Sequence, residues 1–479
     1  MEIRTRFAPS PTGFMHIGNL RTALYAYLYA RHSGGKFILR IEDTDRERYV
    51  DGAVEVIYNT LRTAGIEHDE GPDKDGGCGP YVQSERKEIY KKYAERLVEL
   101  GGAYYCFCTK ERLESLTDAN GVRKYDKHCL NLGKEEVAAR IAAGEPYVIR
   151  QNIPATGKGS YTDLVYGEIT VDYEDLEDNV LLKSDGMPTY NFANVVDDHL
   201  MGITHVIRGT EYLSSTPKYN LIYDSFGWKR PQYMHLPPIM KDEKRKLSKR
   251  YGDANFEDFV KKGYLPEAIV NFIALLGWSP KNNTEKMNMA ELINSFGIEG
   301  ISKSSSIFDE VKMRWLNCQY VKELDLQTFN RYAVPYYEKS KVKGKYDYMK
   351  LSRILSGRTE IFGDIPDHVN FLEEYGPFDV ALFEHQKTKT TREIALKAID
   401  GALSALSGLE EWTNDGIYAL LGGLCEGLGI KKGQMFWAVR IAVSGREVTP
   451  GGATELAEIL GKEETLRRLE FAKELLSNR

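Results

Sequence analysis

The stretch RFAPSPTGFMHIGN, residues 6–19, decides the fold of this chain. It leaves a short apolar segment and enters residues 17–32, where leucines recur at four-residue spacing and predict a helix. Gly-Gly at residues 34–35 ends that helix, and KFILRI at residues 36–41 has the length and branched content of a buried strand. A strand, a helix and a second strand of these lengths favour a parallel pair joined by a crossover, so the stretch opens a doubly wound α/β domain.

A second unit of the same kind follows far along the chain. His205–Ile207 predicts a strand, and a helix should open with Thr216 as its N-cap and Pro217 in the first turn, and end at Gly227. The two units are separated by an insertion of about 100 residues, far longer than an ordinary connection, so we expect a subdomain there. Beyond residue 255 the periodicity is mainly helical.

The composition describes a folded protein of several domains. The chain has 479 residues, 42% of them hydrophobic and 28% charged, which excludes a largely disordered or low-complexity chain. No run approaches the ~18 apolar residues of a membrane span and no cationic leader opens the chain, so we expect a cytoplasmic protein without membrane contact. Six cysteines are too few for a disulfide scaffold and are expected to be thiols.

The net charge of −6 speaks against a nucleic-acid partner, but its distribution along the chain does not. Residues 331–358 hold eight Lys and Arg against two acidic residues, and residues 241–250 hold six cations against two anions. Residues 359–426 contain an excess of Asp and Glu that balances these basic stretches in the net charge. Basic stretches suit a polyanion, and an acidic face elsewhere limits nonspecific RNA binding.

The loop at residues 9–19 suits a bound triphosphate. Backbone N–H groups at a helix start are unpaired and partly positive, Gly13 and Gly18 allow close approach, and His16 could donate to a phosphate oxygen. The basic segment 241–250 follows a strand-like segment and could fold over the same triphosphate. Taken singly, these motifs would instead indicate a capped helix with a satisfied histidine and a solvated surface loop.

Two strings carry a family resemblance. MHIGN at residues 15–19 and KLSKR at residues 246–250 are similar to the HIGH and KMSKS signatures of class I aminoacyl-tRNA synthetases, in the same order and around an insertion. Asn19 departs from the final histidine of the first signature, as glutamyl enzymes commonly do. Over essentially the whole chain, longer strings resemble bacterial glutamyl-tRNA synthetases: RFAPSPTG at 6–13, RIEDTD at 40–45, GP at 71–72, QSER at 83–86, LKSDGMPTY at 182–190 and NVVDDHLMG at 194–202.

The resemblance implies an α/β fold with a Rossmann-like doubly wound catalytic domain. We expect that domain in residues 1–105 and 196–254, an inserted acceptor-binding subdomain in 106–195, a helical stem-contact domain in 255–325 and a helical anticodon-binding domain in 326–479. The helix-rich tail argues against glutaminyl-tRNA synthetase, whose anticodon domain is built from β-barrels. It also argues against a nucleotidyltransferase and against the truncated relative that glutamylates a modified tRNA base, since neither has such a tail.

The implied reaction joins L-glutamate to tRNA(Glu) through a glutamyl-adenylate made from ATP with Mg²⁺. Positioning and charge neutralisation suffice for this chemistry, so the resemblance implies catalytic roles for His16, Lys246 and Lys249. We expect a monomer. The ATP-binding residues implied are Pro9, Thr12, Gly13, His16, Gly18, Asn19, Glu211, Lys246 and Lys249.

Glutamate brings two carboxylates and one ammonium group, so its pocket needs cations and an anion. Arg6 and Arg208 match the carboxylate-binding positions of the family, Arg208 for the side-chain carboxylate, and Glu42 matches the partner of the ammonium group. Taken alone, each arginine would be interpreted as an exposed ion pair. The full set implied for glutamate is Arg6, Ala8, Ser10, Glu42, Tyr190, Asn194 and Arg208.

Three cysteines of the insertion could hold a structural Zn²⁺ together with a fourth donor, although their spacing contains no Cys-x-x-Cys pair. Some glutamyl-type synthetases complete such a group with a histidine two residues after the third cysteine or a tyrosine four residues before it. Here the first position is Asn131 and the second is Tyr125. The resemblance therefore implies Cys106, Cys108, Tyr125 and Cys129, with His128 in reserve, and the alternative is three buried thiols.

Arg358 matches the position at which discriminating glutamyl enzymes set an arginine against the third anticodon base, and the alternative is a surface arginine. Two functional alternatives stay open. The enzyme could be non-discriminating and also glutamylate tRNA(Gln), or the chain could be an inactive paralogue that binds RNA. The inactive paralogue is disfavoured because all the main implied catalytic and glutamate-binding residues are present: His16, Lys246, Lys249, Glu42 and Arg208.

Overall fold

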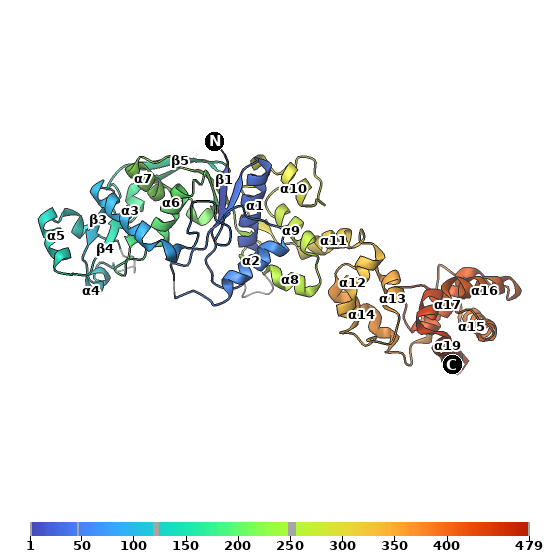
Figure 1. Cartoon of the computed structure of the whole chain (residues 1–479). Helices are drawn as coiled ribbons and strands as arrows, with labels where there is room; N and C mark the ends of the chain where they lie inside the picture. Colours follow the sequence, from blue (N-terminus) through green and yellow to red (C-terminus); the bar gives the residue numbers. More distant parts are fainter. Residues whose placement is uncertain (1, 46, 118–123, 248–254, 478–479) are drawn as a thin grey trace. The chain divides into compact units, whose positions relative to one another are not determined.

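The computed structural model describes residues 2–45, 47–117, 124–247 and 255–477. Contacts within the chain divide it into two compact units, residues 1–259 with 266–310 and residues 260–265 with 311–479. Figure 1 shows the two units coloured along the sequence. Within the described ranges, no helix combines the length and the apolar character needed to cross a membrane.

Parallel strands form the centre of the first unit. β1 (Arg4–Phe7) pairs in parallel with β2 (Lys36–Leu39), and β8 (His205–Gly209) pairs in parallel with β9 (Gln232–Leu236). The two pairs meet where the Thr204 N–H donates to the carbonyl oxygen of Arg4 at 2.9 Å. α1 (Ile17–His32) links β1 to β2, and α7 (Thr216–Phe226) links β8 to β9, so both predicted strand–helix–strand units are confirmed.

The helix α1 is buried because its apolar positions cover most of its surface. Leu20, Leu24 and Leu28 are all fully buried, and α1 lies beside β1, α9 and α10 in Figure 1. The Gly-Gly turn after α1 is required by close packing, since a Cβ on Gly35 would lie 2.1 Å from the carbonyl oxygen of Ile3. That carbonyl accepts the Lys36 N–H at 2.8 Å, which starts β2 beside β1.

The start of α7 differs from the prediction by one residue. The N-cap is Ser215, and Thr216 is the first residue of the helix. The hydroxyl of Thr216 donates to the carbonyl oxygen of Tyr212 at 2.8 Å and also accepts from Arg208. The prediction of Thr216 as N-cap is therefore wrong, because its side chain binds the preceding turn and an arginine of β8.

The insertion contains an antiparallel sheet and a hairpin. β3 (Ala103–Cys106), β4 (Val148–Gln151) and β7 (Val180–Leu182) form the sheet in the order β3-β4-β7. β5 (Lys158–Asp163) and β6 (Gly167–Asp172) form the hairpin, and β5 continues the parallel sheet beside β9, with Asp163 opposite Tyr233. The insertion thus supplies two strands to the sheet that carries β8 and β9.

The first unit contains further helices and short strands, and one 3-10 turn, η1, contributes to the site described below. They are α2 (Ala53–Thr63), the 3-10 turn η1 (Gln83–Arg86), α3 (Lys87–Glu99), α4 (Lys110–Glu114), α5 (Lys134–Ala142), α6 (Tyr190–Leu200), β10 (Ile239–Met240), α9 (Pro266–Leu275), α10 (Met289–Ser295) and β11 (Ser306–Ile307). The boundary between the units falls within α8 (Phe256–Lys262) and at the first residue of α11 (Glu310–Val321).

The second unit is helical in its described residues. Residues 260–265 belong to it because the Leu265 N–H donates to Asn317 Oδ1 at 2.8 Å and the Phe362 N–H donates to the carbonyl oxygen of Gly263 at 3.1 Å. Its α-helices after α11 are α12 (Leu326–Tyr337), α13 (Tyr348–Leu355), α14 (Ile365–Val369), α15 (Arg392–Ser407), α16 (Asn414–Gly427), α17 (Lys432–Ser444), α18 (Ala453–Leu460) and α19 (Lys462–Ser477).

Candidate active site

The loop between β1 and α1 presents the N-terminus of α1 to a cleft. His16 is the N-cap of α1, and its Nδ1 accepts the Gly18 N–H at 3.0 Å. Because an accepting Nδ1 carries no proton, the neutral ring holds its proton on Nε2, where it can be donated to an anion. The first turn of α1 contains no acidic residue, so the partial positive charge of the helix end is available to a ligand.

The cleft has a volume of about 780 Å³ and lies at the carboxyl ends of β1, β2, β8 and β9, where parallel sheets bind ligands. Among its lining residues, those predicted from sequence are Arg6, Ala8, Pro9, Ser10, Thr12, His16, Gly18, Asn19, Glu42, Tyr190, Arg208, Glu211 and Lys246. Two predicted residues, Gly13 and Asn194, are not in the lining. Asn194 is buried behind it and donates to the carbonyl oxygen of Tyr190. Lys249 lies outside the described residues.

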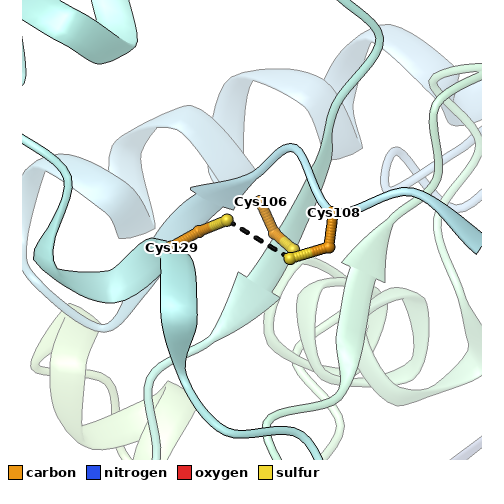
Figure 2. A group of neighbouring side chains, drawn as sticks. All are labelled: Cys106, Cys108 and Cys129. Atoms are coloured by element: carbon orange, nitrogen blue, oxygen red, sulfur yellow. Dashed lines mark hydrogen bonds between the residues drawn. The ribbon is translucent and has the colours of Figure 1, made fainter. Parts of the chain in front are cut away.

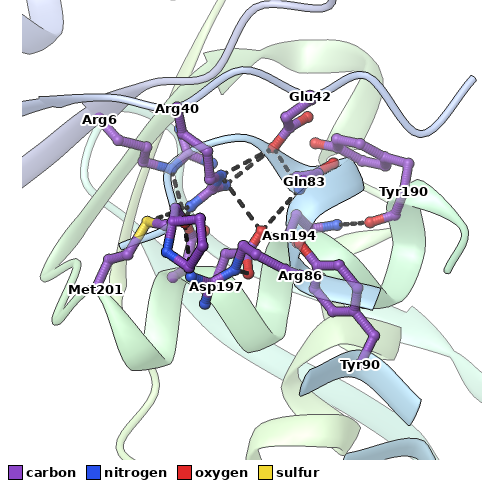
Figure 3. Close-up of polar contacts among 12 residues, drawn as sticks. Arg6, Arg40, Glu42, Gln83, Arg86, Tyr90, Tyr190, Asn194, Asp197 and Met201 are labelled. Atoms are coloured by element: carbon purple, nitrogen blue, oxygen red, sulfur yellow. Dashed lines mark hydrogen bonds and ion pairs between the residues drawn. The ribbon is translucent and has the colours of Figure 1, made fainter. Parts of the chain in front are cut away.

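One wall of the cleft, the ion-paired wall, is a buried group of alternating charges (Figure 3). Arg40 donates to Glu42 Oε1 at 3.0 Å and to Asp198 Oδ1 at 2.7 Å. Arg6 donates to the same oxygen of Asp198 at 3.0 Å and to the carbonyl oxygen of Ile207 at 3.3 Å. Burial raises the pKa of Glu42, with Arg40 acting in the opposite direction. No donor among the described residues reaches Glu42 Oε2, so this oxygen is available to an ammonium group.

Asp197 supports the ion-paired wall from behind and is fully buried. It accepts hydrogen bonds from Arg86 Nε at 2.7 Å, from the Tyr90 hydroxyl at 2.8 Å and from Gln83 Nε2 at 2.9 Å. Three donors of this kind stabilise a buried carboxylate. Because Asp197 and Tyr190 are both on α6, these bonds also hold the helix that carries Tyr190 into the cleft.

A second wall, the neutral wall, surrounds Arg208 on β8. Arg208 Nη2 donates to Thr216 Oγ1 at 2.7 Å, and Arg208 Nε donates to His235 Nε2 at 3.2 Å. Among the described residues, no carboxylate forms an ion pair with Arg208. The guanidinium therefore has no directly bonded anion among the described residues, and Asp198 acts on it only through space. The rings of Tyr212, Tyr219 and Tyr233 lie around it, with centroids 4.9, 5.0 and 5.4 Å away.

Lys246 reaches the cleft from a short hairpin that follows β10. The Leu247 N–H donates to the carbonyl oxygen of Ile239 at 3.0 Å, and Lys246 forms a bridge with Met240. Asp242 closes the turn by accepting the N–H groups of Lys244 and Arg245, at 3.0 and 2.9 Å. The hairpin thus places one lysine of the predicted basic loop in the lining of the same cleft as the N-terminus of α1.

The three cysteines of the insertion lie together (Figure 2). Their sulfur atoms all lie within 4.8 Å of one another, and Cys108 Sγ is 3.5 Å from Cys129 Sγ. The Tyr125 hydroxyl is 3.3 Å from Cys106 Sγ and 3.5 Å from Cys108 Sγ, whereas His128 is exposed. Three sulfurs and one oxygen in such a group match the donor number and chemistry of a tetrahedral zinc site.

Arg358 lies in the second unit, exposed at a hollow of about 160 Å³. Its Nη1 donates to the carbonyl oxygen of Thr449 at 3.1 Å, and the Thr449 hydroxyl accepts from Arg440 at 3.0 Å. Arg440 stacks on Trp437, and that ring stacks on His385 with centroids 3.7 Å apart. Cations and stacked rings together can contact an unstacked RNA base.

The residues that sequence analysis missed are those that hold the walls of the cleft in place. A charged or polar residue inside an apolar strand was the available signal: Arg40 is the fifth residue of KFILRI, and His235 interrupts YMHL. Gln83 and Arg86 stood within the string QSER, and Asp197 and Asp198 within NVVDDHLMG, both noted only as wholes. Thr216 was noted only as a capping residue, and Tyr90 and Asp163 stood in no quoted string. The missed residues are Arg40, Gln83, Arg86, Tyr90, Asp163, Asp197, Asp198, Thr216 and His235.

Two family models match the chain. The model for the catalytic domain of class I tRNA synthetases (E and Q) matches residues 2–315, and a model for an anticodon binding domain matches residues 328–473. The chain is 57% identical to the glutamate–tRNA ligase of Clostridium novyi, covering 99% of this chain and 98% of that protein. It is 53% identical to the glutamate–tRNA ligase of Clostridium tetani, covering 100% and 98%.

Two solved structures resemble the whole chain. One is a glutamate tRNA ligase from Elizabethkingia meningosepticum in complex with its amino acid, with a TM-score of 0.86, 35% identity, and coverage of 99% of this chain and 100% of that chain. The other is a glutamate-tRNA synthetase from Elizabethkingia anophelis, with a TM-score of 0.88, 35% identity and the same coverage.

Proposed function

The chain belongs to the class I tRNA synthetases of the E and Q group, and we propose that it acts as a glutamate–tRNA ligase. The predicted resemblance is confirmed, and so is the predicted fold, an α/β class I catalytic domain followed by an α-helical anticodon-binding domain. Neither the non-discriminating enzyme nor the inactive paralogue is favoured by these comparisons. The observation that carries the proposal is one cleft that offers Arg208, with only neutral partners, together with Glu42 Oε2.

The first step of the proposed reaction makes glutamyl-adenylate. An oxygen of the glutamate α-carboxylate attacks the α-phosphorus of ATP. The bond between that phosphorus and the oxygen it shares with the β-phosphorus breaks, and pyrophosphate leaves. His16 Nε2 and the N-terminus of α1 hold the phosphates, while Lys246 and Lys249 neutralise the charge that builds on the leaving group. In the second step a hydroxyl of the terminal adenosine of the tRNA attacks the acyl carbon, and AMP leaves.

Class I synthetases use ATP with Mg²⁺. When bound, Mg²⁺ supplies positive charge to the phosphate oxygens. The carboxylates of Glu211 and Asp45 line the same cleft and are the oxygen donors that Mg²⁺ prefers. The residues of the chain itself bind, orient and neutralise, and the proposal needs no nucleophilic side chain.

The glutamate pocket lies between the two walls in this proposal. Arg208 binds the side-chain carboxylate, Glu42 accepts from the ammonium group, and Arg6 adds a weaker second cation because Asp198 already accepts from it. Tyr190, Ala8 and Ser10 supply the remaining lining. Asn194 acts from behind, through its bond to the backbone of Tyr190.

Three ranges of the chain are proposed to contact three parts of the tRNA. A single chain in the cytoplasm binds the acceptor end of tRNA(Glu) with residues 106–195, its stem with 255–325 and its anticodon with 326–479. Arg358 contacts the third anticodon base, supported by its fixed position on Thr449 and by the stacked ring of Trp437 nearby.

The cysteine group is proposed to bind a structural Zn²⁺ through Cys106, Cys108, Cys129 and Tyr125. The donor set supports this assignment, since the Tyr125 hydroxyl lies beside two of the three sulfurs. Metal analysis of the purified chain should find about one zinc per chain. The Cys108→Ser variant should lose most of that zinc, whereas Cys78→Ser, a change at a cysteine outside the group, should keep it. A zinc-free wild-type chain would contradict the assignment.

The proposed function is tested by charging purified tRNA(Glu) and tRNA(Gln) with ATP and labelled glutamate. We expect glutamate on tRNA(Glu), and a Lys246→Ala variant should charge it far more slowly, because a cation is missing when pyrophosphate leaves. Equal charging of tRNA(Gln) would replace the proposal with a non-discriminating enzyme. No charging of either tRNA by a folded wild-type chain would leave only an RNA-binding paralogue.

A further inference from the structure

Arg208 is held from behind by two buried residues that do not line the cleft. His235 Nε2 accepts from Arg208 Nε at 3.2 Å, and His235 Nδ1 lies 2.7 Å from Asp163 Oδ2. His235 and Asp163 have side chains with no exposed surface, so no water replaces either contact. The three residues therefore form one chain of hydrogen bonds that ends at the guanidinium in the cleft.

The order of donors and acceptors in this chain is fixed. Arg208 can only donate, so His235 Nε2 must accept and carries no proton. The ring proton is then on Nδ1, where it is donated to Asp163. Burial lowers the pKa of His235, which favours the same neutral ring, although Asp163 acts in the opposite direction.

Asp163 is itself fixed in orientation by the backbone. Its Oδ1 accepts the N–H groups of Val165 and Tyr166, both at 2.9 Å, and its Oδ2 accepts the backbone N–H of His235 at 3.2 Å. All of these partners are donors, as a carboxylate requires. Asp163 ends β5, which belongs to the insertion, so a residue of the insertion determines the protonation of a residue on β9.

We propose that Asp163 and His235 are positioning residues that aim Arg208 at the side-chain carboxylate of the substrate while leaving its charge uncompensated. This inference rests on the proposed function. A carboxylate in the place of His235 would aim the guanidinium equally well but would neutralise it, and a protonated ring would turn a donor toward it. A neutral histidine held in one tautomer is the arrangement that orients an arginine and keeps its charge.

Substitutions that separate the two nitrogens of His235 test the inference. The amide of glutamine ends near the position of imidazole Nε2, so His235→Gln keeps an acceptor for Arg208. The amide of asparagine ends near Nδ1, so His235→Asn keeps the bond to Asp163 and loses the acceptor. We expect His235→Asn to raise the KM for glutamate about 10- to 100-fold. His235→Gln should stay within about threefold of the wild type, with the KM for ATP unchanged within about twofold in both variants.

A change at Asp163 should act through the tautomer. In Asp163→Asn the two backbone N–H groups at Oδ1, both at 2.9 Å, outweigh the single His235 N–H at Oδ2, at 3.2 Å, so we expect the amide oxygen at Oδ1 and the amide NH₂ beside His235 Nδ1. That nitrogen must then accept, and the ring proton moves to Nε2, where it faces the N–H of Arg208. NMR of the full chain labelled with ¹⁵N-histidine should show a protonated Nδ1 for His235 in the wild type and a protonated Nε2 in Asp163→Asn. This NMR measurement does not require the chain to be active.

The matched control is His205→Asn, because His205 is a buried histidine on the same strand as Arg208 and bonds Gln232 instead. It should leave both KM values unchanged. An unchanged glutamate KM in His235→Asn, equal losses in His235→Gln and His235→Asn, or the same tautomer in wild type and Asp163→Asn would each overturn the inference. If the wild-type chain charges no tRNA while the tautomer changes as expected, the proposed function fails and the arrangement of Arg208 stands.

Discussion

Each wall of the cleft contains a buried arginine, Arg6 in the ion-paired wall and Arg208 in the neutral wall. The two are equally buried, but Arg6 is bonded to a carboxylate and Arg208 is bonded to neutral groups. Arg6 and Arg208 are 5% and 6% exposed. Arg6 shares Asp198 with Arg40, so its charge is largely balanced before any ligand arrives. Arg208 has a threonine, a neutral histidine and aromatic rings as partners. The comparison teaches that the partners of a buried arginine, and not its exposure, decide how much charge it offers to a ligand.

The two settings have different energetic consequences. Buried ion pairs cost desolvation that their mutual attraction offsets, and removing one member leaves an unpaired charge. An arginine with only neutral partners keeps part of its desolvation cost until an anion binds. We therefore expect the loss of Asp197, which supports the ion-paired wall from behind, to change mainly stability. Substitutions of residues that face the ligand, in either wall, should change mainly the affinity for glutamate, and most strongly at Arg208.

The largest effect on stability is expected at Asp197. Asp197→Ala removes the acceptor of Arg86, Gln83 and Tyr90 and leaves a buried guanidinium without its anion, so the free energy of unfolding should fall by about 3–5 kcal/mol. Urea unfolding of the full chain measures it. The control is Asp224→Ala, which breaks an exposed pair with Arg230 and should cost about 1 kcal/mol or less. Equal losses in the two variants would remove the distinction between buried and exposed pairs.

An intermediate effect is expected at Arg6. Arg6→Gln leaves Asp198 paired with Arg40, so the chain should stay folded. The KM for glutamate should rise about tenfold, which corresponds to about 1.4 kcal/mol. Steady-state charging of tRNA(Glu) at varied glutamate concentration provides the measurement. A loss as large as that of an Arg208 variant would show that Asp198 does not weaken Arg6 as a ligand-binding cation.

The smallest effect on stability is expected at Glu42, where a substitution should leave the stability of the chain unchanged or raise it slightly, in contrast to the loss expected for Asp197→Ala. Burial raises the pKa of this carboxyl above its ordinary value, so at neutral pH its ionised form is less favourable in the folded chain than in the unfolded chain. Glu42→Gln should therefore leave the free energy of unfolding unchanged or raise it, by no more than about 1 kcal/mol, because Arg40 still has Asp198 and an amide oxygen as acceptors. The same variant should bind glutamate poorly. A clear destabilisation would show that Glu42 is a structural ion-pair member and not a ligand-binding one.

Much of the fold could be predicted from local patterns. The helix at residues 17–32 has the predicted bounds, because four-residue apolar spacing and a Gly-Gly stop are local signals. The pairing of Asp163 with Tyr233 could not be predicted, since it joins a residue of the insertion to a strand far along the chain and no local pattern specifies such a partner. The hydroxyl of Thr216 shows the same limit: a capping residue type was identified, and its partner Arg208 was not.

The site was predicted to the extent that the family strings identify residues that touch the ligand. Most of those residues line one cleft, although their roles remain predictions. The residues behind them were missed because a polar residue inside an apolar segment, such as Arg40 or His235, indicates burial but not its partner, and only the folded chain shows which of these residues are paired. The predicted domain limits and the role of Lys249 also remain predictions.

The central claim is that Arg208 binds the side-chain carboxylate of glutamate, and the Arg208→Ala variant tests it most directly. Charging of tRNA(Glu) at varied glutamate and ATP concentrations should show kcat/KM for glutamate lower by about 10²- to 10³-fold, because a desolvated charge pair is lost, with the KM for ATP unchanged within about twofold. Arg230→Ala, at an exposed pair outside the cleft, serves as the control. Glutamate turnover near the wild-type value in a folded Arg208→Ala chain would contradict the claim.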